Sequence, residues 1–186
     1  MEPTVYDGLK RYGFDAEAAE VAARSTGMWL DTWDRESWFP EYFDPEPDQS
    51  INASATDTAW RTYSWSNLMP LMRTHELIAD EPWSASSGIR FGTLGLPGTN
   101  TVHDVWLRGH RYGVSAGPRL TRLVQDGRVV FEARGARVVV RDFVLTDTGA
   151  SFRVTAQGPV RVSVWPRTHG GPRQVETAAG STTVHL

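Results

Sequence analysis

The chain has 186 residues, which allows one or two domains, and its 40% hydrophobic and 22% charged residues are ordinary for a globular protein. No apolar run reaches the ~18 residues that cross a bilayer, and the start of the chain lacks a signal-peptide pattern, so we expect a cytoplasmic protein with no membrane partner. The absence of cysteine excludes a disulfide framework and a thiolate metal site.

Charge is distributed unevenly along the chain. Residues 1–83 hold 16 acidic and 6 basic residues, a net charge of −10, together with six of the eight tryptophans. Residues 84–186 hold 6 acidic and 13 basic residues, a net charge of +7. This change predicts two structural units, 1–83 and 84–186. The arginines of the second unit are spread along alternating patterns, which is typical of a solvated sheet face and argues against a nucleic-acid partner.

The first unit is predicted to be helical. Apolar residues recur at helical spacing over 5–12, and Gly13 is suited to end that helix in the left-handed conformation. Asp15 is a good N-cap for a second, Ala-rich helix that ends by residue 30. A third helix is expected over 63–78, where Pro70 predicts a kink or a late start.

From Gly88 onward the apolar period changes to two, which predicts strands. Asp126-Gly127 is a strong hairpin-turn signal between two of them. Short strands with regular turns indicate an all-β sandwich, and we expect the polar, Gly-rich segment 170–183 to be poorly ordered. The candidate strands are 89–94, 102–107, 112–116, 120–125, 128–133, 137–145, 151–157 and 160–165.

A long loop predicted over residues 31–57 carries the candidate chemistry, because it places Glu41 among aromatic residues. Apolar rings raise the pKa of a neighbouring carboxyl group, and aromatic faces suit the C–H faces of sugar rings. Both features fit glycoside hydrolysis, which uses a pair of carboxyl groups. The alternative is that Glu41 is a solvated turn residue and that the tryptophans are core anchors. The aromatic residues around Glu41 in this loop are Trp38, Phe39, Tyr42 and Phe43, and two further indoles, Trp60 and Trp65, follow downstream of it.

Three short motifs follow one another in the first unit: Leu9-Lys10-Arg11-Tyr12-Gly13-Phe14, Glu41-Tyr42-Phe43-Asp44-Pro45 and Tyr63-Ser64-Trp65-Ser66. Their order resembles the last stretch of the trehalase-like glycosidases, which include mannosylglycerate-hydrolase-like enzymes and relatives of the processing α-glucosidases. The resemblance covers residues 3–79 and implies an inverting (α/α)₆ toroid glycoside hydrolase that acts on small α-linked saccharides. It further implies that Glu41 is the general base and that Trp65 lines the sugar pocket, with Trp38, Phe39 and Trp60 as wall residues.

The chain departs from that family in lacking the general acid, which there is an aspartate far upstream of the base. The nearby aspartates are Asp7, Asp31 and Asp34, and none of them is favoured. We therefore expect an α+β chain, with the last helices of an (α/α)₆ toroid followed by an all-β sandwich, and a missing N-terminal barrel as its partner. Because one carboxylate cannot both protonate the leaving oxygen and activate water, we expect this chain alone to be inactive.

Two further functions remain open from the sequence: a non-catalytic carbohydrate-binding module and a structural scaffold. His103, Asp104 and His110 are candidate metal ligands, but two histidines without a third partner more often make hydrogen bonds, so no metal or other cofactor is expected. Trehalose, glucosylglycerate, mannosylglycerate and kojibiose-like sugars all stay candidate substrates.

Overall fold

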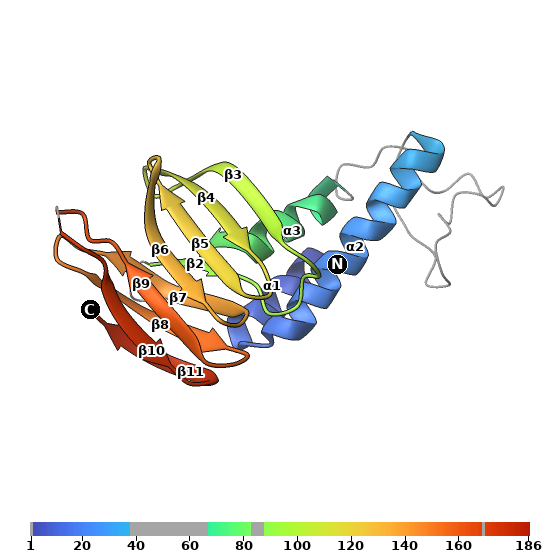
Figure 1. The fold of residues 1–186 in the computed structure, drawn as a ribbon. Helices are drawn as coiled ribbons and strands as arrows, with labels where there is room; N and C mark the ends of the chain where they lie inside the picture. Colours follow the sequence, from blue (N-terminus) through green and yellow to red (C-terminus); the bar gives the residue numbers. More distant parts are fainter. Residues whose placement is uncertain (1, 38–66, 83–87, 169) are drawn as a thin grey trace. The chain divides into compact units, whose positions relative to one another are not determined.

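The computed structural model describes residues 2–37, 67–82, 88–168 and 170–186. The chain divides into two compact units, Met1–His75 and Glu76–Leu186, whose elements are traced in Figure 1. None of the helices in the described ranges is long and apolar enough to cross a bilayer.

The first unit begins with helices α1 (Glu2–Tyr12) and α2 (Asp15–Glu36). Gly13, with φ of 82°, ends α1 as the sequence predicts. Asp15 does not act as the N-cap of α2, because it is the first residue of the helix and no side-chain hydrogen bond caps the helix. Instead its buried carboxylate lies 2.5 Å from the Nζ of Lys10, which is also buried.

Helix α2 continues to Glu36, so the prediction of a loop is wrong over residues 31–36. The physical reason is an aromatic pair one helical turn apart: Trp29 and Trp33 stack with ring centroids 5.7 Å apart. Ser37 ends the helix in the left-handed conformation, and its backbone N–H donates to the carbonyl oxygen of Trp33 at 2.8 Å.

Helix α3 (Met69–Leu77) begins with Pro70 in its first turn, where proline costs no helical hydrogen bond. This agrees with the late start that the sequence predicts. Met69 and Met72 pack in one core cluster with Tyr6, Ala18 and Ala22 of the first two helices.

The second unit consists of two antiparallel sheets. One sheet has five strands in the order β1 (Ile78–Asp80), β2 (Ile89–Gly92), β7 (Val138–Leu145), β8 (Ala150–Ala156) and β11 (Gly180–His185). The other has six strands in the order β10 (Arg173–Thr177), β9 (Val160–Val164), β6 (Arg128–Arg134), β5 (Leu120–Gln125), β4 (His110–Ala116) and β3 (Asn100–Leu107).

The core of this unit lies between the two sheets. Phe131 of the six-stranded sheet makes edge-to-face contacts with three phenylalanines of the five-stranded sheet, at centroid distances of 5.0 to 5.9 Å. Such contacts between facing sheets confirm the predicted β-sandwich character. The three partners of Phe131 are Phe91, Phe143 and Phe152.

The other half of the predicted fold class, the last helices of an (α/α)₆ toroid, is wrong. The described residues form three helices and two antiparallel sheets, and no toroid of helices is present among them (Figure 1). Helices α1 to α3 share one small core cluster, whereas most of the fully buried large side chains belong to the sheets. Helical periodicity and capping predict individual helices, but they do not predict that these helices close into a ring.

Candidate functional site

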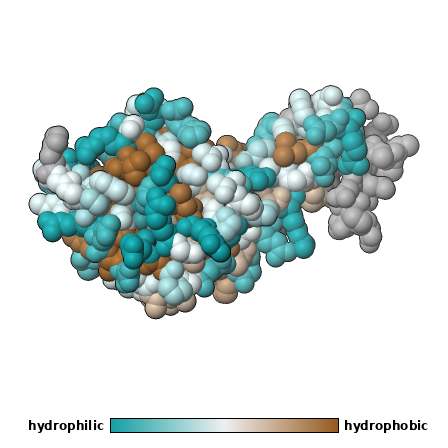
Figure 2. Space-filling model, in the orientation of Figure 1, coloured by the Kyte–Doolittle hydropathy of each residue, from teal (hydrophilic) through white to brown (hydrophobic). Residues whose placement is uncertain are grey.

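One face of the six-stranded sheet is polar across its whole width. Cross-strand partners of an antiparallel sheet share a face, and the registers of all six strands join polar residues into one row. The neighbouring row contains Val114, Leu123 and Phe131, which are buried in the sandwich core, so the polar row lies on the outer face. The surface in Figure 2 is mixed, with hydrophilic side chains interspersed with apolar patches. The row consists of Thr101, Ser115, Arg122, Glu132, Ser163 and Gln174.

A β-bulge in β3 adds polar side chains to this outer face. The β3–β4 register shifts between Val102 and Val105, so His103 and Asp104 together oppose the single Gly113 of β4. Asp104 has a φ of 59°, in the left-handed region that aspartate tolerates better than most residues. Bulges redirect side chains and are common next to functional sites.

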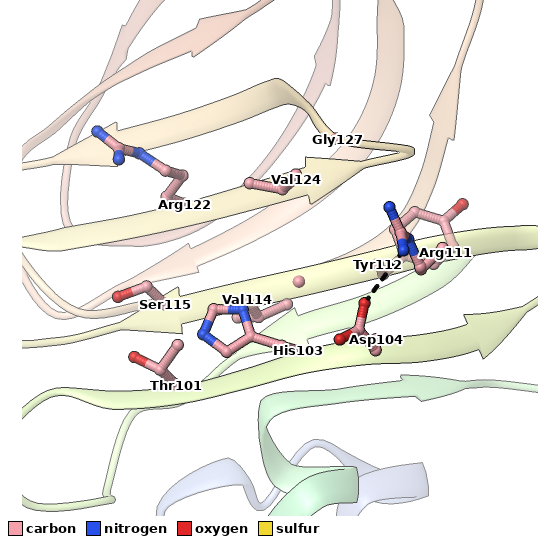
Figure 3. A pocket seen from close by; sticks show the side chains of 11 residues that line it. Thr101, His103, Asp104, Arg111, Tyr112, Val114, Ser115, Arg122, Val124 and Gly127 are labelled. Atoms are coloured by element: carbon pink, nitrogen blue, oxygen red, sulfur yellow. Dashed lines mark ion pairs between the residues drawn. The ribbon is translucent and has the colours of Figure 1, made fainter.

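A hollow of about 340 Å³ opens over β3, β4 and β5 at this bulge (Figure 3). Gly113 keeps it open, because a Cβ atom at that position would lie 3.4 Å from the Nδ1 atom of His103. The absence of a side chain at residue 113 thus leaves room for a ligand. The polar residues that line the hollow are Thr101, His103, Asp104, Arg111, Ser115 and Arg122.

Three ion pairs position arginines in and beside the hollow. Arg111 and Asp104 point toward each other in Figure 3, with Nη1 of Arg111 3.6 Å from Oδ1 of Asp104. Arg122 pairs with Glu132 at 2.6 Å, and Arg134 pairs with the same carboxylate at 2.7 Å. The exposed Arg111–Asp104 pair contributes only ~0–1 kcal/mol to stability, whereas Glu132 is buried. Because a guanidinium has five N–H donors, the pairs orient the arginines without exhausting their capacity to bind a ligand.

Other polar groups in the hollow make no contact that would compete with a ligand. The side chains of Thr101, His103 and Ser115 form no hydrogen bond with any other residue in the described part of the chain. Their donors and acceptors are therefore available for hydrogen bonds to a ligand.

An exposed tryptophan lies beside the hollow on the same face. Trp106 pairs across the strands with Arg111, which lines the hollow, and the Trp106 side chain is 69% exposed. The ring offers a flat apolar surface next to hydrogen-bonding groups.

The β5–β6 hairpin fixes β4 at one end of the hollow. Asp126 (φ 51°) and Gly127 (φ 82°) form the turn, which confirms the predicted hairpin. Oδ1 of Asp126 accepts the backbone N–H of Arg111 at 2.9 Å, and its Oδ2 lies 2.7 Å from Nδ1 of His110. Both hydrogen bonds lower the pKa of Asp126 below its ordinary value of 3.8, and the one from the Arg111 backbone has the larger effect.

The predicted catalytic and sugar-binding residues lie outside the described ranges. These residues are Glu41, Trp65, Trp38, Phe39 and Trp60. The local aspartates are described: Asp7 lies on α1, Asp31 and Asp34 lie on α2, and all three are exposed. None of these three aspartates lines the hollow on the sheet.

The candidate metal ligands separate in the structure. His103 and Asp104 lie at the bulge, whereas His110 pairs with Asp126 at the hairpin. In the described ranges, no group of three or more His, Cys, Asp or Glu side chains is placed to hold a metal ion.

Most polar residues of the hollow were not predictable from sequence patterns, namely Thr101, Arg111, Ser115 and Arg122, and neither was Trp106 beside it. One signal was present: the pair His103-Asp104 interrupts the alternation between Val102 and Val105. Two consecutive polar residues inside an otherwise alternating strand are what a β-bulge produces. The local pattern does not predict which strand lies opposite these two residues, or that a glycine faces them, because both depend on the strand register.

No protein-family model matches the chain, and neither does any curated protein or solved structure.

Proposed function

We propose that the outer face of the six-stranded sheet binds a carbohydrate and does not cleave it. The observation that carries this proposal is the bulge at His103 and Asp104 over Gly113, which combines a hollow of about 340 Å³ with converging polar side chains. Small-molecule sites are concave and use a few well-placed polar groups to orient their ligands.

The kinds of polar group around the hollow favour a sugar. A sugar hydroxyl both donates and accepts hydrogen bonds, so it can bind between the acceptor Asp104 and the donor Arg111. Ser115 and Thr101 add hydroxyl groups that can act in either role. The exposed ring of Trp106 is suited to the C–H face of a pyranose.

The charges around the hollow favour a carbohydrate over a nucleic acid. Nucleic-acid sites present clusters of arginine and lysine to the phosphates. Here Arg111 is paired with Asp104, while Arg122 and Arg134 share Glu132. The carboxylates on this face would repel a phosphate backbone, but they are good acceptors for hydroxyl groups.

Calorimetric titration of the full chain with trehalose, kojibiose and maltose tests the proposal. We expect saturable binding of at least one of these sugars without release of glucose. Trp106→Ala and Asp104→Asn should each weaken that binding at least about 10-fold, or ~1.4 kcal/mol. The matched control is Trp33→Ala on α2, which also removes an indole that is partly exposed (42%). This variant should leave the affinity unchanged. No saturable binding up to about 50 mM sugar, well above a millimolar Kd, would refute the proposal.

A glycoside hydrolase role is a second proposal, supported by the sequence motif around Glu41 and by Trp65 downstream of it. If that role is right, Glu41→Gln in an active enzyme that contains this chain should reduce turnover by orders of magnitude, because the general base would no longer activate water. Near-normal turnover of that variant would refute the role of Glu41. Cleavage of a bound sugar by this chain alone would contradict both the binding proposal and the expected inactivity.

A further inference from the structure

A second hollow lies next to the first on the same sheet. It measures about 360 Å³ and is lined by Thr99, Ser115, Gly117, Pro118, Arg119 and Leu120. Ser115 lines both hollows, so they meet at that residue along β4 and the β4–β5 turn. Together the two hollows form an extended site that is longer than the first hollow alone.

The second hollow has a rigid end. The β4–β5 turn is closed by a hydrogen bond from the Gly117 N–H to the Leu120 carbonyl oxygen at 2.9 Å. Its tip is attached to the connection that follows β6, because the Gly135 N–H donates to the Arg119 carbonyl oxygen at 3.0 Å. The backbone of Arg119 is therefore fixed, which lowers the entropy cost of using its side chain for binding.

The charge at this end is positive and incompletely balanced. The exposed Arg119 side chain forms no hydrogen bond or ion pair with any residue in the part of the chain that the structure describes. Arg137 lies nearby and donates to the Gly98 carbonyl oxygen at 3.1 Å, next to Thr99. Glu132, the carboxylate on this side of the sheet, is shared by Arg122 and Arg134. By contrast, Arg111 at the other end of the site faces Asp104.

We infer that the site takes an acidic oligosaccharide, with one sugar unit in the hollow at Asp104 and a following unit that carries a carboxylate toward Arg119. This inference rests on the proposed carbohydrate binding and adds the length and the charge of the ligand. A guanidinium binds a carboxylate through two parallel hydrogen bonds, which supplies both affinity and orientation.

Two trisaccharides of the same α-1,4 linkage test the inference on the full chain: trigalacturonate, which is acidic, and maltotriose, which is neutral. We expect trigalacturonate to bind at least about 10-fold more tightly than maltotriose at low salt. Arg119→Gln should remove most of this difference, because it weakens the binding of trigalacturonate much more than the binding of maltotriose. Galacturonate monomer should bind weakly to either protein, because it cannot occupy both hollows.

Arg173→Gln on the far edge strand β10 removes the same charge away from both hollows and is the matched control. It should leave both affinities unchanged. Equal binding of the two trisaccharides would overturn the inference, and so would an unchanged preference for trigalacturonate in Arg119→Gln. In either case the proposed carbohydrate binding still stands if Trp106→Ala weakens the binding of maltotriose. Binding of neither sugar would refute the proposed function and the inference with it.

Discussion

Gly113 is the residue on which the first hollow depends most directly. A Cβ atom there would make ordinary contact with His103 at 3.4 Å, so a larger side chain fits the strand but occupies the hollow. We predict that Gly113→Val folds normally, since β-branched residues suit strands, with a melting temperature within about 5 °C of the parent protein. Calorimetry should show that its saccharide binding is lost.

The control for Gly113→Val is Ser163→Val on β9, which makes a similar change on the same face but away from the hollow. This variant should bind sugar like the parent protein. If Gly113→Val is folded and binds normally, the ligand does not occupy the hollow.

Asp126 links the pH of the solution to the hairpin beside the hollow. Its pKa is lowered below 3.8 by the Arg111 backbone N–H and by His110, so its charged form stabilises the folded state. That stabilisation is fully present above the unfolded-state pKa of ~3.9 and is lost as the pH falls through the lower folded-state pKa. We predict that the stability difference between the parent protein and Asp126→Asn narrows below about pH 4, as measured by urea unfolding at several pH values. A difference that does not change with pH would contradict this role.

Among the elements, α1 and α2 are joined by the buried pair of Lys10 and Asp15. Removing one member takes from a buried charge its partner at 2.5 Å, so Lys10→Met should cost about 3–5 kcal/mol of stability in urea unfolding. The double variant Lys10→Met/Asp15→Leu should recover much of this loss, because no charge then stays buried. A single variant as stable as the parent protein would show that Asp15 is hydrated when Lys10 is removed.

In the sheets, Gly92 at the end of β2 combines a positive φ of 90° with a close backbone approach. A Cβ atom there would lie 2.4 Å from the carbonyl oxygen of Val138, so Gly92→Ala should cost about 3 kcal/mol or more. Gly98 also has a positive φ, 67°, but a Cβ atom there meets nothing within 4 Å. Gly98→Ala should therefore cost only about 1 kcal/mol, and thermal unfolding of the two variants separates strain from steric clash. Equal losses of stability in the two variants would show that the backbone at Val138 moves away to make room for the added Cβ atom.

Most strands were predictable because each contains its own signal. The alternation over 120–125 and 128–133, with Asp126-Gly127 between them, predicts β5, β6 and their turn. The segment 170–183 was predicted to be poorly ordered, but it contains β10 and the start of β11. Both strands lie at sheet edges and are largely exposed, so they are held by backbone ladder hydrogen bonds, which leave no apolar pattern in the sequence.

At the scale of the whole molecule, the sequence predicts the sandwich but not the face that carries the candidate site. The hollow depends on the registers of three strands, which bring Gly113 opposite His103 and Asp104 and place Ser115 beside Arg122. These are long-range relations that a local pattern does not contain. The toroid was expected from the family resemblance alone. This prediction is wrong, because the described helices α1 to α3 do not form a ring. The roles predicted for Glu41 and Trp65 stay predictions.

The central claim, that the outer face of β3, β4 and β5 binds a saccharide, is tested most directly by mapping backbone amide chemical shifts of the ¹⁵N-labelled full chain during titration with an α-linked disaccharide. We predict that the largest shift changes fall on residues 101–106, 111–115 and 122–124, and that they saturate with a single binding curve. Shift changes confined to other residues, or none at saturating sugar, would contradict the claim.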